Sequence, residues 1–166
     1  REIFRVAVKL FGRAQKNVSL GLMLTASILS MVMSNTATTA MLVAAVMPYL
    51  RTLGSESGFR KAVLLGIPAA ASVGGMGTII GSAPNAVAVG ALEQIGYEVS
   101  FLDWMLLGAP LSLILCLGFW FALGRKYPWG NELVTLDLET TGDGQTSRRA
   151  RSIVIVTTLL TIGLWL

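Results

Sequence analysis

Five apolar runs, separated by short polar segments, make up most of the chain. They cover residues 18–33, 37–50, 62–92, 101–124 and 152–166. A helix that crosses a bilayer needs about 20 predominantly apolar residues, and long runs with few charges are typical of membrane helices. The pattern therefore predicts an all-α membrane protein.

Residues 1–17 differ from these runs because their polar and apolar positions alternate with the period of an α-helix. Basic side chains share one face of that helix and apolar side chains share the other. The basic positions are Arg5, Lys9, Arg13 and Lys16, and the apolar positions are Ile3, Phe4, Ala7, Leu10, Phe11 and Ala14. A helix of this kind lies in the headgroup region of a membrane, so we predict an amphipathic interfacial helix over 1–17.

The first two runs flank an uncharged polar tripeptide, Ser34-Asn35-Thr36. The runs have 16 and 14 residues, which give helices of about 24 and 21 Å, shorter than a hydrocarbon core of about 30 Å. We predict a re-entrant helical hairpin over 18–50 with the tripeptide at its tip inside the membrane. Two short, tilted spans are the alternative.

The third run, 62–92, has 31 residues and is longer than a span requires. Its middle reads SVGGMGTIIGSAPNA, and four glycines followed by Pro-Asn disfavour a continuous helix. We predict a broken transmembrane helix, with one arm over 62–73 and a second that starts near Asn85. Irregular backbone at membrane depth is tolerated where it is buried in protein or lines a cavity. A small-residue surface for helix packing is the alternative explanation of the glycines.

The remaining apolar runs contain no comparable interruption. The run 101–124 predicts a plain transmembrane helix, with Trp104 and Trp120 as anchors at the membrane interface. The polar segment 125–151 predicts a flexible loop, and 152–166 predicts the start of the next transmembrane helix. The chain does not begin with methionine and its last run stops in mid-pattern, so we expect it to be a fragment.

The distribution of charge predicts the topology. All 13 Lys and Arg residues lie in 1–17, 51–61 and 125–151, whereas 93–103 holds three acidic residues and none that is basic. By the positive-inside rule the three basic segments are cytoplasmic and 93–103 is outside, so 18–50 must enter and leave on one side. The prediction is a multi-pass membrane protein, in the inner membrane if it is bacterial. This topology explains the net charge of +4 without a nucleic-acid partner.

Enzymatic chemistry finds little support in the composition. The chain has no histidine, and its single cysteine, Cys116, lies inside an apolar run. Ser34 has no nearby histidine or lysine in the sequence to activate it as a nucleophile. We predict neither an enzyme nor a bound cofactor.

The two interruptions of apolar sequence together favour a binding site. A half-helix begins at Thr36 and another near Asn85, and the free N–H groups at such starts favour an anion. The preceding arms end in free carbonyl groups, which together with Ser and Asn oxygens suit Na⁺. Discontinuous helices of this kind are typical of secondary transporters. N-capping of an ordinary helix is the structural alternative for Ser34 and Asn35.

Three stretches together resemble one transporter family. SMVMSNTATTAML, ASVGGMGTIIGSAPN and FLDWMLLGAPLSL are similar to segments of the divalent-anion:sodium symporter (DASS) family, whose members carry dicarboxylates, citrate or sulfate. The resemblance implies half of an inverted-repeat transporter that works as a homodimer by alternating access. The Ser-Asn-Thr tip of the second repeat is not in this sequence.

The resemblance also implies roles for individual residues. Ser34, Asn35 and Thr36 would contact a carboxylate of the substrate. Na⁺ would be held by Ser30, Ser34 and Asn35 together with backbone carbonyls near Gly81. The residues of the break that would shape the site are Gly77, Thr78, Ser82, Pro84 and Asn85. The break departs from the usual Gly-Thr-Pro-Pro-Asn of the family by reading GSAPN, which leaves the substrate preference open.

These observations predict sodium-coupled symport of a divalent anion, either a C4-dicarboxylate or a citrate-like anion. The alternatives within transport are a carrier of sulfate or another inorganic anion, and a sodium-independent anion exchanger. From another class of function, the alternatives are an anion channel and a non-transporting membrane scaffold.

Overall fold

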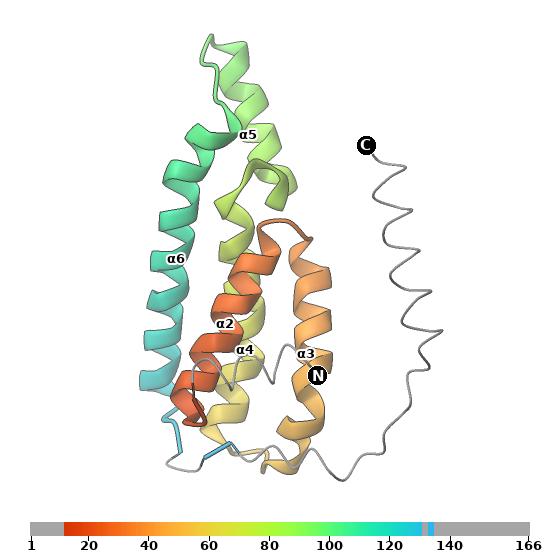
Figure 1. Ribbon diagram of the computed structural model, residues 1–166, viewed down its shortest axis with the longest axis vertical. Coiled ribbons are helices and arrows are strands. Elements are labelled where there is room, and N and C mark those ends of the chain that lie inside the picture. The colour runs from red at the N-terminus through yellow and green to blue at the C-terminus, as the bar shows by residue number, and fades with distance from the viewer. Residues whose placement is uncertain (1–11, 131–132, 135–166) are drawn as a thin grey trace, which may run out of the picture. The chain divides into compact units, whose positions relative to one another are not determined.

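The computed structural model describes residues 12–130 and 133–134 as a set of packed helices (Figure 1). Its elements, in chain order, are α2 (Gln15–Ser30), α3 (Asn35–Thr52), α4 (Gly58–Gly74), the 3₁₀ turns η1 (Gly75–Gly77) and η2 (Ile79–Gly81), α5 (Ala83–Gln94) and α6 (Phe101–Lys126). Apart from an isolated bridge between Ala14 and Leu133, the described residues form no β-structure. The predicted all-α class is confirmed for this part of the chain.

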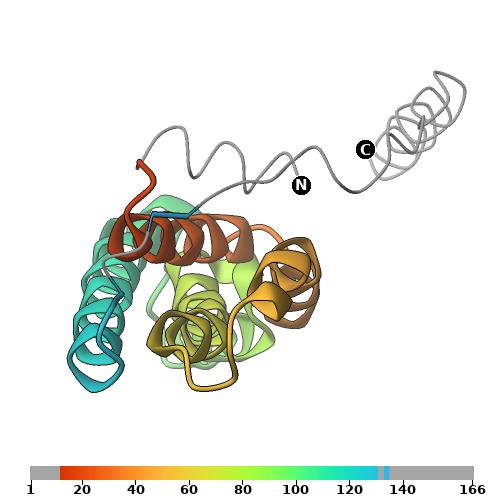
Figure 2. The same ribbon diagram turned by 90° about the horizontal axis from the view of Figure 1, so that it is seen from below.

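The core lies between α2, α3 and α4, which stand side by side (Figures 1 and 2). The most extensive packing joins α2 to α4, and α6 lies against both of them from outside. Apolar side chains four residues apart on α3 form its single buried stripe, as expected for a helix that packs on one face. These residues are Leu42, Val46 and Leu50.

Glycine allows α2 and α4 to approach closely where both helices end. A Cβ atom added to Gly74 would lie only 2.5 Å from the Cα atom of Ser27. Carbon atoms without a bond between them pack at about 3.5–4.0 Å. A side chain at this position would therefore force the two helices apart.

Replacing Gly74 with alanine is expected to destabilise the bundle, because the added methyl group meets backbone rather than a mobile side chain. Overpacking of this kind costs about 1–3 kcal/mol. Thermal unfolding of the detergent-solubilised protein measures the effect. Gly118→Ala on α6 is the matched control, since an added Cβ there has nothing within 4 Å. Equal melting temperatures for the two variants would contradict the close crossing.

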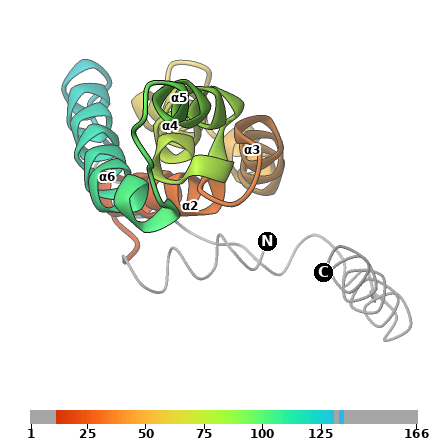
Figure 3. The ribbon, with the colours of Figure 1, turned by 90° about the horizontal axis from the view of Figure 1, so that it is seen from above.

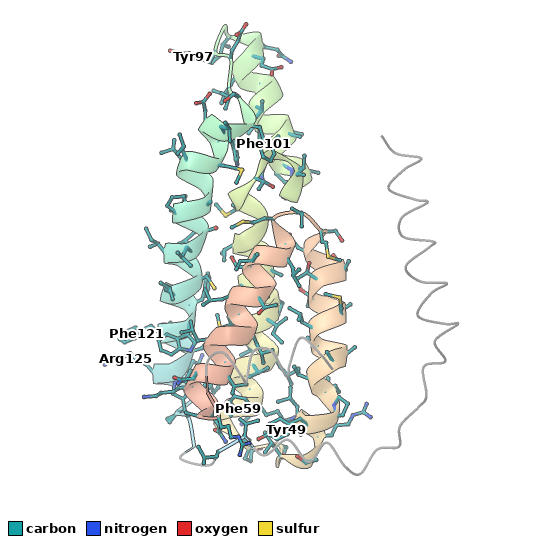
Figure 4. All side chains as sticks on the ribbon, viewed as in Figure 1. Tyr49, Phe59, Tyr97, Phe101, Phe121 and Arg125 are labelled. Carbon is teal, nitrogen blue, oxygen red and sulfur yellow. The ribbon has the colours of Figure 1, made fainter. Side chains whose placement is uncertain are left out.

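The helix α5 lies beyond the end of α4 and is offset from it by the turns η1 and η2 (Figure 3). Only Asn85 and Val89 of α5 are buried. At the far end of α5 the chain reverses through Gly96, whose φ of 88° lies in the left-handed region that glycine favours. Tyr97 and Phe101 flank this reversal (Figure 4), and α6 then begins behind a capping box of Ser100 and Asp103.

The predicted helix over 1–17 is wrong in its last third, and residues 1–11 lie outside the described part. Gly12 has a φ of 86° and Ala14 is extended, so α2 begins at Gln15. A left-handed glycine typically ends a helix, which is why the amphipathic period cannot continue through this point. The other boundaries differ by only a few residues. The largest such difference is at α4, which Ser57 caps and which begins at Gly58, four residues before the predicted start.

One indole N–H group and one glutamine side chain tie the start of α2 to the end of α6 and the residues that follow it. Trp120 Nε1 donates to the carbonyl of Lys16 at 3.1 Å, and the N–H of Gly130 donates to Gln15 Oε1 at 2.9 Å. The rings of Trp120 and Trp129 stack with centroids 6.3 Å apart. The two helix ends are thus fixed to each other although they are far apart in the sequence.

Charge is segregated between the two ends of the bundle. The described basic residues lie where α2 and α4 begin and where α3 and α6 end, as Arg125 illustrates in Figure 4. Among the described residues, one acidic residue shares that end: Glu56, whose carboxyl accepts from Lys61 Nζ at 2.7 Å, a hydrogen bond that lowers its pKa. Glu93, Glu98 and Asp103 lie at the opposite end.

One described helix, α6, is long and apolar enough to cross a membrane. Its most apolar window has a mean hydropathy of 2.1 and is only 11% buried. Most of its side chains therefore face away from the other helices, as Phe121 does in Figure 4.

Candidate functional site

The tip of the predicted hairpin is the turn between α2 and α3. α2 ends at Ser30, and Ser34 caps α3 by accepting a hydrogen bond from the N–H of Ala37 at 3.2 Å. The N-capping alternative is therefore realised for Ser34. The other N–H groups in the first turn of α3 have no partner within the helix, and they give its start a partial positive charge.

The predicted break is the stretch between α4 and α5. Thr78 is extended between η1 and η2, and Ser82 is extended before α5. The Thr78 hydroxyl accepts from the N–H of Gly81 at 3.0 Å and donates to the carbonyl oxygen of Met31. Thr78, which is only 3% exposed, therefore joins the break to the tip.

Asn85 holds the two ends of the break together. Its Nδ2 donates to the carbonyl of Gly75 at 2.7 Å and to that of Thr78 at 2.8 Å. The side chain is buried and comes from the first turn of α5. Backbone carbonyls that have left a helix and are buried need such partners, so Asn85 stabilises the irregular path of the chain.

Asn35 brings the start of α3 against the break. The Ser30 hydroxyl donates to Asn35 Oδ1 at 2.6 Å. On its other side, Asn35 lies against Gly75 so closely that a Cβ atom there would be 3.1 Å from Nδ2 and nearer still to Oδ1. The end of α2, the start of α3 and the end of α4 therefore meet at one place.

Backbone oxygens from both segments converge at Gly81. A Cβ atom added to this glycine would lie 2.6 Å from the carbonyl oxygen of Gly75. It would also lie 3.0 Å and 3.1 Å from the carbonyl oxygens of Ser30 and Met31. We refer to these three carbonyl oxygens as the oxygen cluster. Neutral oxygen ligands of this kind suit a hard cation, and no group of His, Cys, Asp or Glu that could hold a metal occurs among the described residues.

The structure brings together most of the predicted site residues. Those that meet at the tip and the break are Ser30, Asn35, Gly77, Thr78, Gly81 and Asn85. Ser34 and Thr36 are exposed at the start of α3, while Ser82 and Pro84 lie half-buried and exposed at the start of α5. The roles of all ten residues in binding stay predictions.

Sequence reasoning missed three participants. Gly75 and Met31 contribute carbonyl oxygens to the cluster, and nothing in their residue types signals this. Trp104 Nε1 donates to the carbonyl of Met76 at 3.0 Å, so this indole does more than the predicted anchoring at the interface. The signal for this contact in the sequence is Gly108, one helical turn after Trp104. Its missing side chain lets the backbone of Met76 approach α6 closely.

Comparison with known proteins assigns the chain to a family. Residues 2–166 match the family model described as citrate transporter. The chain belongs to the citrate transporter family. Membership of this family makes it part of an integral membrane protein and confirms the resemblance to sodium-coupled divalent-anion symporters.

Individual relatives of this member of the citrate transporter family are named as transporters. The chain is 40% identical to an uncharacterized transporter of Haemophilus influenzae over 66% of its own length and 24% of the relative. It is 27% identical to the sodium-dependent dicarboxylate transporter SdcS of Staphylococcus saprophyticus over 98% of its own length and 35% of the relative. An uncharacterized transporter of Schizosaccharomyces pombe is 30% identical over 93% of the chain and 17% of the relative.

The chain thus spans about a third or less of the length of the curated relatives it matches. The names of these relatives describe transporters rather than enzymes, in agreement with the prediction that this chain is not an enzyme.

Proposed function

We propose that this chain forms one half of a sodium-coupled symporter for a divalent anion, either a C4-dicarboxylate or a citrate-like anion. The observation that carries the proposal is the oxygen cluster at Gly81, which lies beside the start of α3. A cation site and a helix N-terminus next to each other provide the opposite charges that ion-coupled anion transport needs. The name of the related sodium-dependent dicarboxylate transporter supports the same choice of ion and substrate.

In this proposal Na⁺ binds first, between the tip and the break. Its ligands are the oxygen cluster together with oxygens of Ser30, Ser34 and Asn35, and its charge lowers the cost of holding an anion in the membrane. The substrate carboxylate then binds at Ser34, Asn35 and Thr36. The hydroxyl-bearing side chains of Ser34 and Thr36 are exposed in this chain, so they are free to face a substrate and the second half of the site.

The proposed position of the tip inside the membrane agrees with the lengths of the two arms. α2 has 16 residues and α3 has 18, which correspond to about 24 and 27 Å, shorter than a hydrocarbon core of about 30 Å. A re-entrant hairpin fits these lengths better than two full spans. The homodimer implied by the family resemblance stays a prediction.

The test is uptake of labelled succinate into proteoliposomes that contain the full-length protein. We expect uptake to require a Na⁺ gradient and to be inhibited by unlabelled citrate or succinate. Uptake that does not depend on Na⁺ would favour the sodium-independent anion exchanger. Inhibition by sulfate alone would favour a carrier of inorganic anions. A conductance that does not saturate with the anion would favour a channel.

Asn35→Asp is expected to abolish anion uptake, because a fixed negative charge at the start of α3 repels a carboxylate. The measurement is the initial rate of succinate uptake under a Na⁺ gradient. Asn17→Asp, the same change near the start of α2 at the other end of the bundle, is the control and should retain uptake. Full sodium-dependent uptake by Asn35→Asp would remove Asn35 from the proposed site.

A further inference from the structure

The turn η1 exposes backbone groups that a continuous helix would have satisfied. Two carbonyls of the break, those of Gly75 and Thr78, receive hydrogen bonds from Asn85. The carbonyl of Met76 between them receives its hydrogen bond from another helix, through Trp104 Nε1 at 3.0 Å. The path of the break is thus fixed by two side chains that lie on different elements.

The indole reaches the break because α6 carries glycine one turn further along. A Cβ atom added to Gly108 would lie 2.7 Å from the carbonyl oxygen of Met76 and 3.3 Å from that of Gly77. It would also lie 3.2 Å from Trp104 Nε1. Trp104 and Gly108 therefore form one contact surface of α6, fitted to the backbone of η1.

The tip contacts the same turn through different atoms. Gly75 lies against the Asn35 side chain, and Gly77 lies against the side chain of Met31. Between these two glycines, the carbonyl of Met76 contacts α6 instead. η1 is consequently held between the tip of the hairpin and α6, and the same turn supplies the Gly75 oxygen to the oxygen cluster.

We propose that Trp104 is a positioning residue for the sodium site, a role that rests on the function proposed above. Its indole N–H fixes the Met76 peptide and, through it, the adjacent carbonyl of Gly75. Without this donor the Met76 carbonyl loses the hydrogen bond to α6, and its peptide is free to turn. The Gly75 oxygen then moves relative to the other two oxygens of the oxygen cluster. Na⁺ therefore binds more weakly, while the anion site at the start of α3 is unchanged.

Trp104→Phe tests this role, because it keeps an aromatic ring and removes the N–H. Trp120→Phe is the matched control: it deletes an equivalent bond, from Trp120 Nε1 to the carbonyl of Lys16 at 3.1 Å, at the other end of the same helix. Two quantities are measured in proteoliposomes with the full-length protein. They are the Na⁺ concentration for half-maximal succinate uptake and the KM for succinate at saturating Na⁺.

For Trp104→Phe we expect the half-maximal Na⁺ concentration to rise about fivefold, the effect of losing one hydrogen bond of ordinary net strength. The KM for succinate at saturating Na⁺ should stay within about twofold of the wild type. Trp120→Phe should change neither quantity. If both variants shift the Na⁺ dependence equally, or if Trp104→Phe leaves it unchanged, the positioning role is wrong.

A second pair of variants covers the case in which Trp104→Phe does not fold. Gly108→Ala places a methyl group against the Met76 carbonyl, whereas Gly118→Ala on the same helix meets nothing within 4 Å. The first should raise the half-maximal Na⁺ concentration and the second should not; equal values overturn the proposal. Wild-type uptake that does not depend on Na⁺ would overturn the proposed function and this role together. Sodium-dependent uptake by the wild type, with the same half-maximal Na⁺ concentration in the variants, would overturn this role alone.

Discussion

Gly81→Ala is expected to abolish sodium-dependent uptake while the protein still inserts and folds. The added Cβ atom would occupy the point on which the oxygen cluster converges, 2.6 Å from the carbonyl oxygen of Gly75. Real Cβ atoms do not approach oxygen so closely, so either the carbonyls retreat or the position is filled by a methyl group. Both outcomes remove the ligands of the proposed Na⁺ site. The measurement is succinate uptake as a function of Na⁺ concentration.

The matched control for this variant is Gly90→Ala on α5. An added Cβ at Gly90 has nothing within 4 Å, and alanine favours a helix over glycine by about 1 kcal/mol. Gly90→Ala should therefore insert normally and show wild-type dependence on Na⁺. A Gly81→Ala variant with the same Na⁺ dependence as Gly90→Ala would mean that the ion binds elsewhere.

The second large effect is expected for Asn85→Asp. The Nδ2 group that now donates to the carbonyls of Gly75 and Thr78 at 2.7 and 2.8 Å would be replaced by an oxygen that repels both. The side chain is only 8% exposed, so water cannot compensate, and an unpaired buried charge costs about 3 kcal/mol or more. Uptake should be lost and the melting temperature of the solubilised protein should fall.

Asn85→Ala separates the two causes of this effect. It deletes both hydrogen bonds without adding charge, so we expect a loss of stability and uptake between those of the wild type and Asn85→Asp. If the alanine and aspartate variants were equally impaired, charge repulsion would contribute nothing. If neither were impaired, Asn85 would not hold the break together.

The interruptions were predictable from sequence because their causes are local. Glycines end α4, a proline lies in the first turn of α5 and a capping serine starts α3, wherever the rest of the protein lies. The amphipathic period misled at the start of α2, because periodicity alone does not register that Gly12 adopts a positive φ. Local sequence signals thus predict where helices end to within a few residues.

The contacts that turn two interruptions into one site were not predictable in this way. The oxygen cluster depends on carbonyl groups, which every residue carries, so residue type cannot mark Met31 or Gly75. The sequence indicated Trp104 only as an anchor at the membrane interface, because it lies near the end of an apolar run, and its hydrogen bond to the break was not foreseen. Its N–H partner, Met76, lies 28 residues earlier.

The hydrogen bond between Thr78 and Met31 has a consequence for biosynthesis. It joins residues 47 positions apart, and a ribosome adds about 5–20 residues per second, so the tip is made about 2–9 s before its partner exists. During that interval the Met31 carbonyl lacks the hydroxyl that binds it in the folded chain. We therefore expect the turn between α2 and α3 to reach its final arrangement only after the break has been synthesised.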